Sequence, residues 1–160
     1  MDILQEAKKR FERGFHSPAA EWEYLNSLMT HPEPQRHALL EWVFSESPAY
    51  WDTRARAGQV LLEENEEETW EIIERLVHSG DPDDNGTALT MFENLGDPRG
   101  LELAQQWLAE DAHLATQFEA IDFLWDIYPA QVHQRLQALV DHPRESVRRR
   151  ARNLLAEFES

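Results

Sequence analysis

The residues best suited to metal chemistry lie between Asp81 and Gly86, in the stretch DPDDNG. A calcium-binding loop places oxygen ligands at positions one, three and five and a glycine at position six, where the chain turns sharply. The twelfth position should hold a bidentate glutamate, but here it is Phe92, and Glu93 falls one residue late. The sequence therefore leaves two interpretations open. One is a weak calcium site, and the other is an acidic turn whose carboxylates favour the start of the next helix.

Other chemical motifs are sparse. Glu110 and His113 have the spacing of half a di-iron carboxylate site, but the second copy that such a site requires is absent, which favours a surface histidine. The sequence has no His-Glu-x-x-His motif, no nucleophile elbow and no glycine-rich phosphate loop. It also has no cysteine, so disulfides and thiolate metal sites are excluded. We predict a non-enzyme with no catalytic residue, no bound metal and no cofactor.

Carboxylates are concentrated in one short stretch around residue 67. The members of this acidic stretch are Glu63, Glu64, Glu66, Glu67, Glu68, Glu71 and Glu74. Such a run is either a solvated face or a docking patch for lysine and arginine side chains of a partner, joined by acids of the next turn. We take Glu67, Glu68, Glu71, Asp83 and Asp84 as candidate partner-binding residues.

The net charge is the strongest feature of the composition. The chain has 31 acidic and 15 basic residues among 160, a net charge of −16, and its last 20 residues contain five arginines but only four acids. A field of this sign repels nucleic-acid phosphates and anionic lipid and speeds association with basic proteins. Acidic surfaces also keep proteins soluble, so solubility alone is the competing explanation.

The element that would position these residues is a helical hairpin repeated along the chain. Between Pro129 and Phe158, two apolar runs with a three-to-four-residue spacing flank a polar break at Asp141-His142-Pro143. Moving this unit back by 31 residues superimposes Pro98 on Pro129, and further moves, the last with one extra residue, extend the series to Gln35. One hairpin cannot bury its own apolar stripes, so a constant period predicts stacked hairpins, that is, a solenoid.

The segment from Asp141 to Leu155 follows the pattern Asp-x-Pro-x-x-x-Val-Arg-x-x-Ala-x-x-x-Leu. It resembles the second half of a HEAT repeat, in particular the short bacterial form first associated with phycobilisome lyases. The likeness covers roughly residues 35–158 and is best in the last copy, whereas the pairs Thr116-Gln117 and Asn85-Gly86 lose the arginine. The resemblance implies a HEAT- or armadillo-type scaffold that holds other macromolecules on a curved surface.

The segment from Ala112 to Tyr128, expected as one helix, is apolar on two sides. One stripe is shared with other copies, and a second contains Leu114, Phe118, Ile121 and Trp125. The second stripe is either packed in the interior or supplies aromatic anchors on the concave face. In the second case Trp125, Phe118, Asp122 and Asp126 would contact a partner.

These observations predict an all-α, right-handed solenoid of about ten helices in five antiparallel hairpins. Residues 1–34 would form an N-terminal helical cap, and residues 35–159 would form four repeats of about 31 residues in one domain. The start lacks a long apolar run, so we expect neither a signal peptide nor a membrane span. We therefore expect a cytoplasmic protein, and we expect it to be a monomer. The basic first helix is interpreted as a cap rather than a membrane-surface element. We expect Arg148 to pair with acids of a neighbouring copy rather than with nucleic acid.

The expected function is protein binding, with a basic protein as partner. An immunity or antitoxin-type inhibitor that covers the phosphate-binding surface of a basic nuclease would have this size and charge. The alternative is a lyase-like or chaperone-like accessory protein that acts on a client, which only the resemblance suggests.

Overall fold

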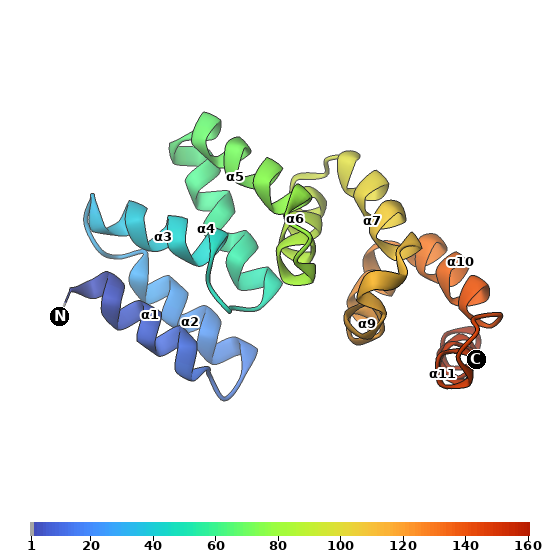
Figure 1. The fold of residues 1–160 in the computed structure, drawn as a ribbon. Coiled ribbons are helices and arrows are strands. Elements are labelled where there is room, and N and C mark those ends of the chain that lie inside the picture. The colour runs from blue at the N-terminus through green and yellow to red at the C-terminus, as the bar shows by residue number, and fades with distance from the viewer. Residues whose placement is uncertain (1) are drawn as a thin grey trace. The chain divides into compact units, whose positions relative to one another are not determined.

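A computed structural model describes residues 2–160, with all their side chains except that of Ala112. These residues form helices and no strands, and they divide into two compact units, residues 1–97 and 98–160 (Figure 1). The first unit contains α1 (Ile3–Arg13), α2 (Pro18–Leu28), α3 (Gln35–Ser45), α4 (Trp51–Glu64), α5 (Glu66–His78) and α6 (Pro82–Leu95). The second contains α7 (Arg99–Ala109), a 3₁₀ turn at Asp111–His113, α8 (Leu114–Glu119), α9 (Ile121–Ile127), α10 (Pro129–Leu139) and α11 (Glu145–Glu159).

Helices pack on their neighbours along the chain within each unit. In the first unit, α4 contacts α3, α5 and α6, and α3 also contacts α1. In the second unit, α10 contacts α7, α9 and α11. This order of contacts is that of an α-solenoid, so the predicted fold class is confirmed, while right-handed stacking of antiparallel pairs stays a prediction.

The apolar stripes predicted from the sequence form the core of each unit. The fully buried large side chains of the first unit come from α2 to α6, and they are Leu25, Leu39, Leu40, Phe44, Leu61, Ile73, Leu76, Leu89 and Met91. Those of the second unit are Leu108, Leu124 and Leu136. Burial of each such side chain contributes about 1.5–3 kcal/mol, which is how short helices become stable together.

Side-chain caps fix the starts of four helices, those of α1, α2, α5 and α6. The capping oxygens belong to Asp2, Ser17, Asn65 and Asp81, and each accepts a hydrogen bond from a backbone amide of the first helical turn. Ser17 is followed by Pro18 at the first helical position, as the sequence predicts. The caps at Asn65 and Asp81 fix the starts of α5 and α6, whose first turns contain candidate partner-binding acids of the sequence analysis.

Two stretches differ from what their sequence pattern predicts: a serine-proline pair such as Ser47-Pro48 is typical of a helix start, and the segment from Ala112 to Tyr128 is expected as one helix. Ser47-Pro48 does not open a helix, because the Ser47 hydroxyl donates back to the carbonyl of Val43 and α4 begins only at Trp51. A short connection therefore separates the end of α3 at Ser45 from the start of α4 at Trp51. In this connection the Tyr50 amide donates a hydrogen bond to the Glu21 carboxylate at 2.9 Å.

The expected helix from Ala112 to Tyr128 is divided into the 3₁₀ turn, α8 and α9. In α8, the buried Gln117 donates to the carbonyls of Trp107 and Glu110, which fixes α8 at the end of α7. In contrast, α9 packs on α10. The two halves are held by different neighbours, and the direction changes at Ala120, where ψ is −1°. This division explains why the described residues form eleven α-helices rather than about ten.

A buried arginine connects two successive hairpins in the first unit. Arg54 of α4 is 2% exposed, and its guanidinium donates to the carbonyls of Phe44 and Ser45 at the end of α3, at 3.0 and 3.2 Å. The same group pairs with Asp84 of α6 at 2.8 Å. The corresponding Arg148 of α11 donates to the carbonyls of His142 and Pro143, not to an acid of a neighbouring copy as expected.

We predict that Asp84→Ala lowers the free energy of unfolding by about 3 kcal/mol, because the buried Arg54 charge would lose its counter-ion. Urea denaturation followed by circular dichroism measures this effect. Asp83→Ala is the matched control one residue away, because it removes one exposed hydrogen bond, from the Trp51 indole, and leaves the partner of Arg54 in place, so stability should change by about 1 kcal/mol or less. Equal effects of the two substitutions would contradict the role assigned to the ion pair.

Candidate protein-binding surfaces

The start of α5 presents an exposed acidic surface. Glu67 and Glu71 lie one helical turn apart on α5, and both are exposed. Among the described residues, no ion pair involves either of them, whereas Glu74 pairs with His78 at 2.9 Å. Glu67 lies in the first turn of α5, where the helix dipole stabilises its negative charge. Glu67 and Glu71 therefore keep their charge available to a partner.

Other acids near this surface are already paired with α3. Arg36 of α3 contacts Glu64 at 2.6 Å, and His37 lies 3.3 Å from a carboxylate oxygen of Glu68. Glu68 is half-buried and also faces Glu41. Burial, and then the nearby Glu68 carboxylate, raises the pKa of Glu41. Glu68, a predicted partner-binding residue, thus serves contacts inside the unit.

The stretch from Asp81 to Gly86 begins a helix and does not form a calcium-binding loop. The Asp81 carboxylate accepts hydrogen bonds from the amides of Asp83 and Asp84, and α6 starts at Pro82. Asp83 accepts a hydrogen bond from the Trp51 indole at 3.1 Å, and Asp84 is held by Arg54. The structure thus has the geometry of the second interpretation, an acidic turn that caps a helix.

Gly86 has a packing role in this arrangement. It lies inside α6 under the ring of Trp51, and a Cβ atom placed on it would stand 2.1 Å from Cε2 of that ring. The glycine that the sequence assigned to a sharp turn is thus required by the close approach of α4 and α6.

The predicted residues of the second unit divide into exposed acids and covered rings. Asp122 and Asp126 of α9 are exposed. Trp125, between them, is half-buried and stacks on Phe158 of α11, with ring centroids 4.3 Å apart and planes 13° apart. Phe118 is 6% exposed, and the Arg150 guanidinium lies 4.6 Å from its ring centroid. Both rings therefore contact the last helix.

Sequence reasoning missed two more exposed aromatic residues. Trp22 of α2 is 37% exposed and Tyr50, just before α4, is 53% exposed. They line an open hollow of about 500 Å³ together with Asp52. No motif or spacing in the sequence marks either ring as exposed. Aromatic rings beside a carboxylate are suited to protein contacts.

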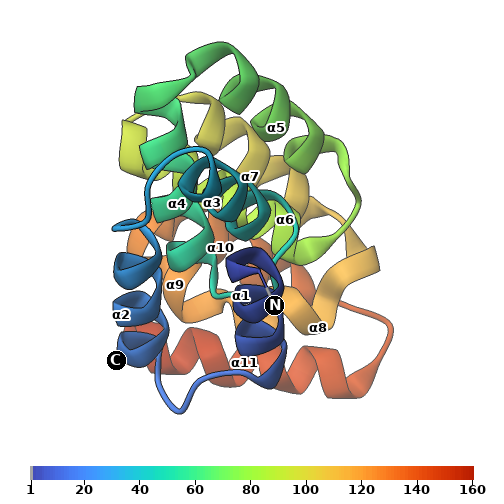
Figure 2. The same ribbon diagram turned by 90° about the vertical axis from the view of Figure 1, so that its left-hand side faces the viewer.

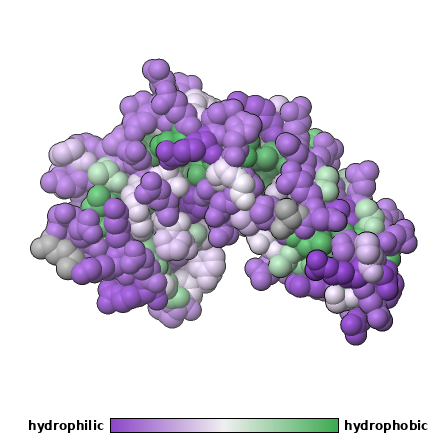
Figure 3. Space-filling view, in the orientation of Figure 1, coloured by the Kyte–Doolittle hydropathy of each residue, from purple (hydrophilic) through white to green (hydrophobic). Residues whose placement is uncertain are grey.

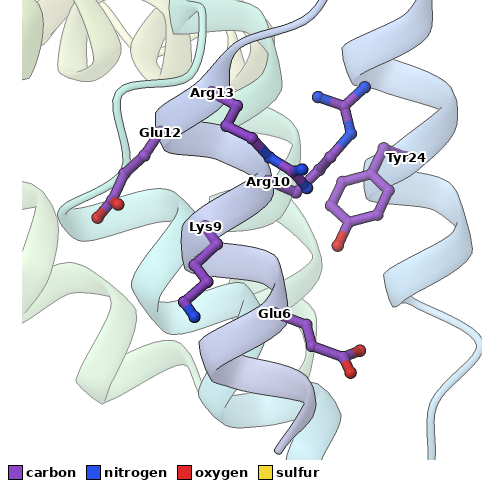
Figure 4. Close-up of a pocket in the computed structure, with 6 residues that line it drawn as sticks. All are labelled: Glu6, Lys9, Arg10, Glu12, Arg13 and Tyr24. Carbon is purple, nitrogen blue, oxygen red and sulfur yellow. The ribbon is translucent and has the colours of Figure 1, made fainter. Parts of the chain in front are cut away.

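The basic side of α1 forms a hollow of its own with α2. Figure 4 shows Arg10 and Arg13 of α1 beside the ring of Tyr24 on α2. The Arg10 guanidinium lies 3.8 Å from the ring centroid of Phe15 and 5.9 Å from that of Tyr24, and it also donates to the Gly14 carbonyl. Burial raises the pKa of Tyr24, against the opposing effect of the nearby arginines. These contacts hold the two helices of the first hairpin together.

The surface seen in Figure 3 is mainly hydrophilic over both units, with hydrophobic residues in small patches. In the second view of the ribbon, Figure 2, α5 runs along the upper edge of the first unit. No helix among residues 2–160 is both long and apolar enough to cross a lipid bilayer.

Comparison with known proteins supports the repeat interpretation. The family model described as HEAT repeats matches residues 69–156, which is more than half of the chain. The chain belongs to the HEAT-repeat family. No curated protein and no solved structure matches it significantly. HEAT repeats are a scaffold type for protein interactions, and in this member the matched region includes α6 and the whole of α7 to α10.

We expect Gly86→Ala to destabilise the protein by about 1–3 kcal/mol, because the new methyl group overlaps the Trp51 ring. Ordinary helix propensity predicts the opposite sign, a gain of about 1 kcal/mol. A double-mutant cycle with Trp51→Ala measures the coupling, since Gly86→Ala should become neutral or stabilising once the ring is removed. A stabilising effect in the wild-type background would refute the contact.

A pH-dependent prediction concerns Asp111, which Arg135 contacts at 2.7 Å and His142 at 3.6 Å. The hydrogen bond from Arg135 lowers the pKa of Asp111 below its ordinary value of 3.8. The ionised carboxylate therefore stabilises the fold above pH 3.8, and this contribution disappears as the pH falls through the lowered value.

Asp111→Asn should accordingly lower the midpoint of urea unfolding at pH 6, and the difference from wild type should shrink as the pH is lowered towards 3. Asp122→Asn, which removes the same charge at an exposed site, controls for the change in net charge. A deficit that is independent of pH would contradict the assignment.

Proposed function

We propose that this HEAT-repeat protein is a non-enzymatic scaffold that binds a basic protein through its acidic surface. The observation that carries the proposal is the start of α5, where Glu67 and Glu71 are exposed and no ion pair among the described residues involves them. The net charge of −16 supports it by steering basic partners towards the whole molecule. We propose a cytoplasmic monomer as the working form.

The acidic surface is suited to lysine and arginine side chains for a physical reason. Both acids, Glu67 and Glu71, lie on a formed helix, so no backbone has to be ordered when a partner binds them. Glu67 and Glu71 also have the spacing at which one arginine or lysine bridges two carboxylates. Asp122 and Asp126 of α9 provide a second exposed pair with the same spacing.

One form of this function is inhibition of a nuclease. A nuclease must carry a basic surface that binds phosphates, and an acidic scaffold that covers this surface would exclude nucleic acid. Size and charge support this form, as does the match to an interaction-type repeat family.

The test starts with capture on the immobilised protein from a lysate of the source organism, first at low salt and then at rising salt. We expect a basic protein that elutes as salt increases, since its contacts are between charges. The captured protein is then purified and titrated against wild type and variants by calorimetry. Recovery of no basic protein at low salt would count against the proposal.

The decisive variant is Glu67→Lys combined with Glu71→Lys. It should weaken binding of the purified partner about tenfold or more, because two attractive contacts become repulsive. Glu102→Lys with Glu157→Lys is the matched control, since both residues are exposed and the change in net charge is identical. Equal loss in the two variants would mean that only the overall field matters and that α5 is not the docking surface.

Inhibition is tested separately, by adding the wild-type protein to the purified partner and measuring cleavage of a labelled nucleic acid. Inhibition at one equivalent supports the nuclease form. Binding without inhibition keeps the scaffold and removes the inhibitor interpretation.

A further inference from the structure

Three side chains that can bind metals converge between α3 and α5 in the first unit. They are His37 and Glu41 of α3 and Glu68 of α5, and one potential ligand atom from each lies within 4.8 Å of the other two. His37 and Glu41 are one turn apart on α3, and Glu68 stands 31 residues after His37, on the first helix of the next hairpin. Neighbouring hairpins therefore bring the imidazole and the third carboxylate together.

The distances in this cluster are close to those around a tetrahedral ion. Zinc bonds to nitrogen and oxygen of about 2.0–2.1 Å place two ligands of a tetrahedral site about 3.3 Å apart. The Nε2 atom of His37 lies 3.3 Å from the Glu68 carboxylate and 3.7 Å from Oε2 of Glu41. These two separations are within about 0.4 Å of the tetrahedral value, and the Glu41 and Glu68 oxygens lie within 4.8 Å of one another.

The surroundings also orient the ligands. The side-chain amide of Asn65 donates to Oε2 of Glu68 at 3.0 Å, and both carboxylate oxygens of Glu68 lie 3.3 Å from Nε2 of His37. A hydrogen bond to a ligand carboxylate is the kind of contact that holds such groups in metal sites. Asn65 is itself fixed as the cap of α5. The carboxylate of Glu68 is thus held in place before any ion arrives.

The cluster also contains an electrostatic conflict that an ion would remove. Glu41 and Glu68 face one another with only the half-exposed His37 between them, and Arg75 lies close enough to Glu41 to act on it. Two carboxylates in contact repel one another, and a divalent cation between them replaces this repulsion with attraction. All three side chains are partly accessible, with 30%, 45% and 34% of their surface exposed, so an ion can enter from solvent.

We propose that His37, Glu41 and Glu68 form a binding site for a divalent zinc-like ion that ties α3 to α5. Three protein ligands leave one position of a tetrahedral ion open to water. This inference goes beyond binding of a basic partner and departs from the expectation, drawn from the sequence, that no metal is bound.

The test is calorimetric titration of Zn²⁺ into chelator-treated protein, with the melting temperature measured in parallel. We expect one site per chain and a higher melting temperature with Zn²⁺, because the ion binds the folded form only. Replacement of zinc by Co²⁺ should give the visible absorption of a four-coordinate complex with nitrogen and oxygen ligands. No heat and no thermal shift with Zn²⁺ would overturn the proposal.

Substitutions locate the site. His37→Gln and, separately, Glu68→Gln should abolish the one-site transition and the thermal shift while the circular dichroism spectrum stays helical. His78→Gln is the matched control, because His78 also pairs with a glutamate one turn away, Glu74 on α5, but does not belong to the three-residue cluster. This substitution should leave zinc binding intact. Binding that survives His37→Gln, or that falls equally in His78→Gln, would place the ion elsewhere and refute the site. If His37→Gln does not fold, Glu68→Gln decides.

Discussion

The buried guanidinium of Arg54 is the contact on which the register of the first unit depends. It is the one charged group placed among the core side chains of α3, α4 and α6, and every one of its described partners lies on a different helix from its own. Such a charge is stable only if its carbonyl and carboxylate partners are in place. Any sliding of α6 against α4 would break the bond to Asp84, so the ion pair specifies one packing arrangement where apolar contacts alone would allow several.

The same constraint explains why so few of the acids in this region are available for binding. Asp81 caps α6, Asp83 accepts a hydrogen bond from the Trp51 indole, and Asp84 neutralises Arg54. Each carboxylate of this turn is therefore engaged in a contact within the first unit. Glu67 and Glu71 of α5 remain exposed, and no ion pair among the described residues involves them. Function in this protein is therefore expected from charges that the fold positions and leaves unneutralised.

The cluster of His37, Glu41 and Glu68 illustrates how repeats can create a site. Successive hairpins lie next to one another, so a ligand on the first helix of one copy faces a ligand on the first helix of the following copy. A search for local motifs misses this arrangement, because its members are 31 residues apart. The exposed pair Trp22 and Tyr50 escaped notice for a related reason, since spacing along a helix does not tell which part of an apolar stripe a neighbour covers.

By itself the sequence determined the all-helical repeat fold, the family, most helix boundaries and the buried stripes. Period and spacing are enough for these, because they decide which side chains share a helix face. Only the tertiary structure decided which carboxylates are free and which are paired, that Gly86 makes room for Trp51, and that the expected helix from Ala112 to Tyr128 is divided. Those outcomes depend on contacts between helices far apart in the chain, and hydrophobic periodicity carries no information about which neighbours meet.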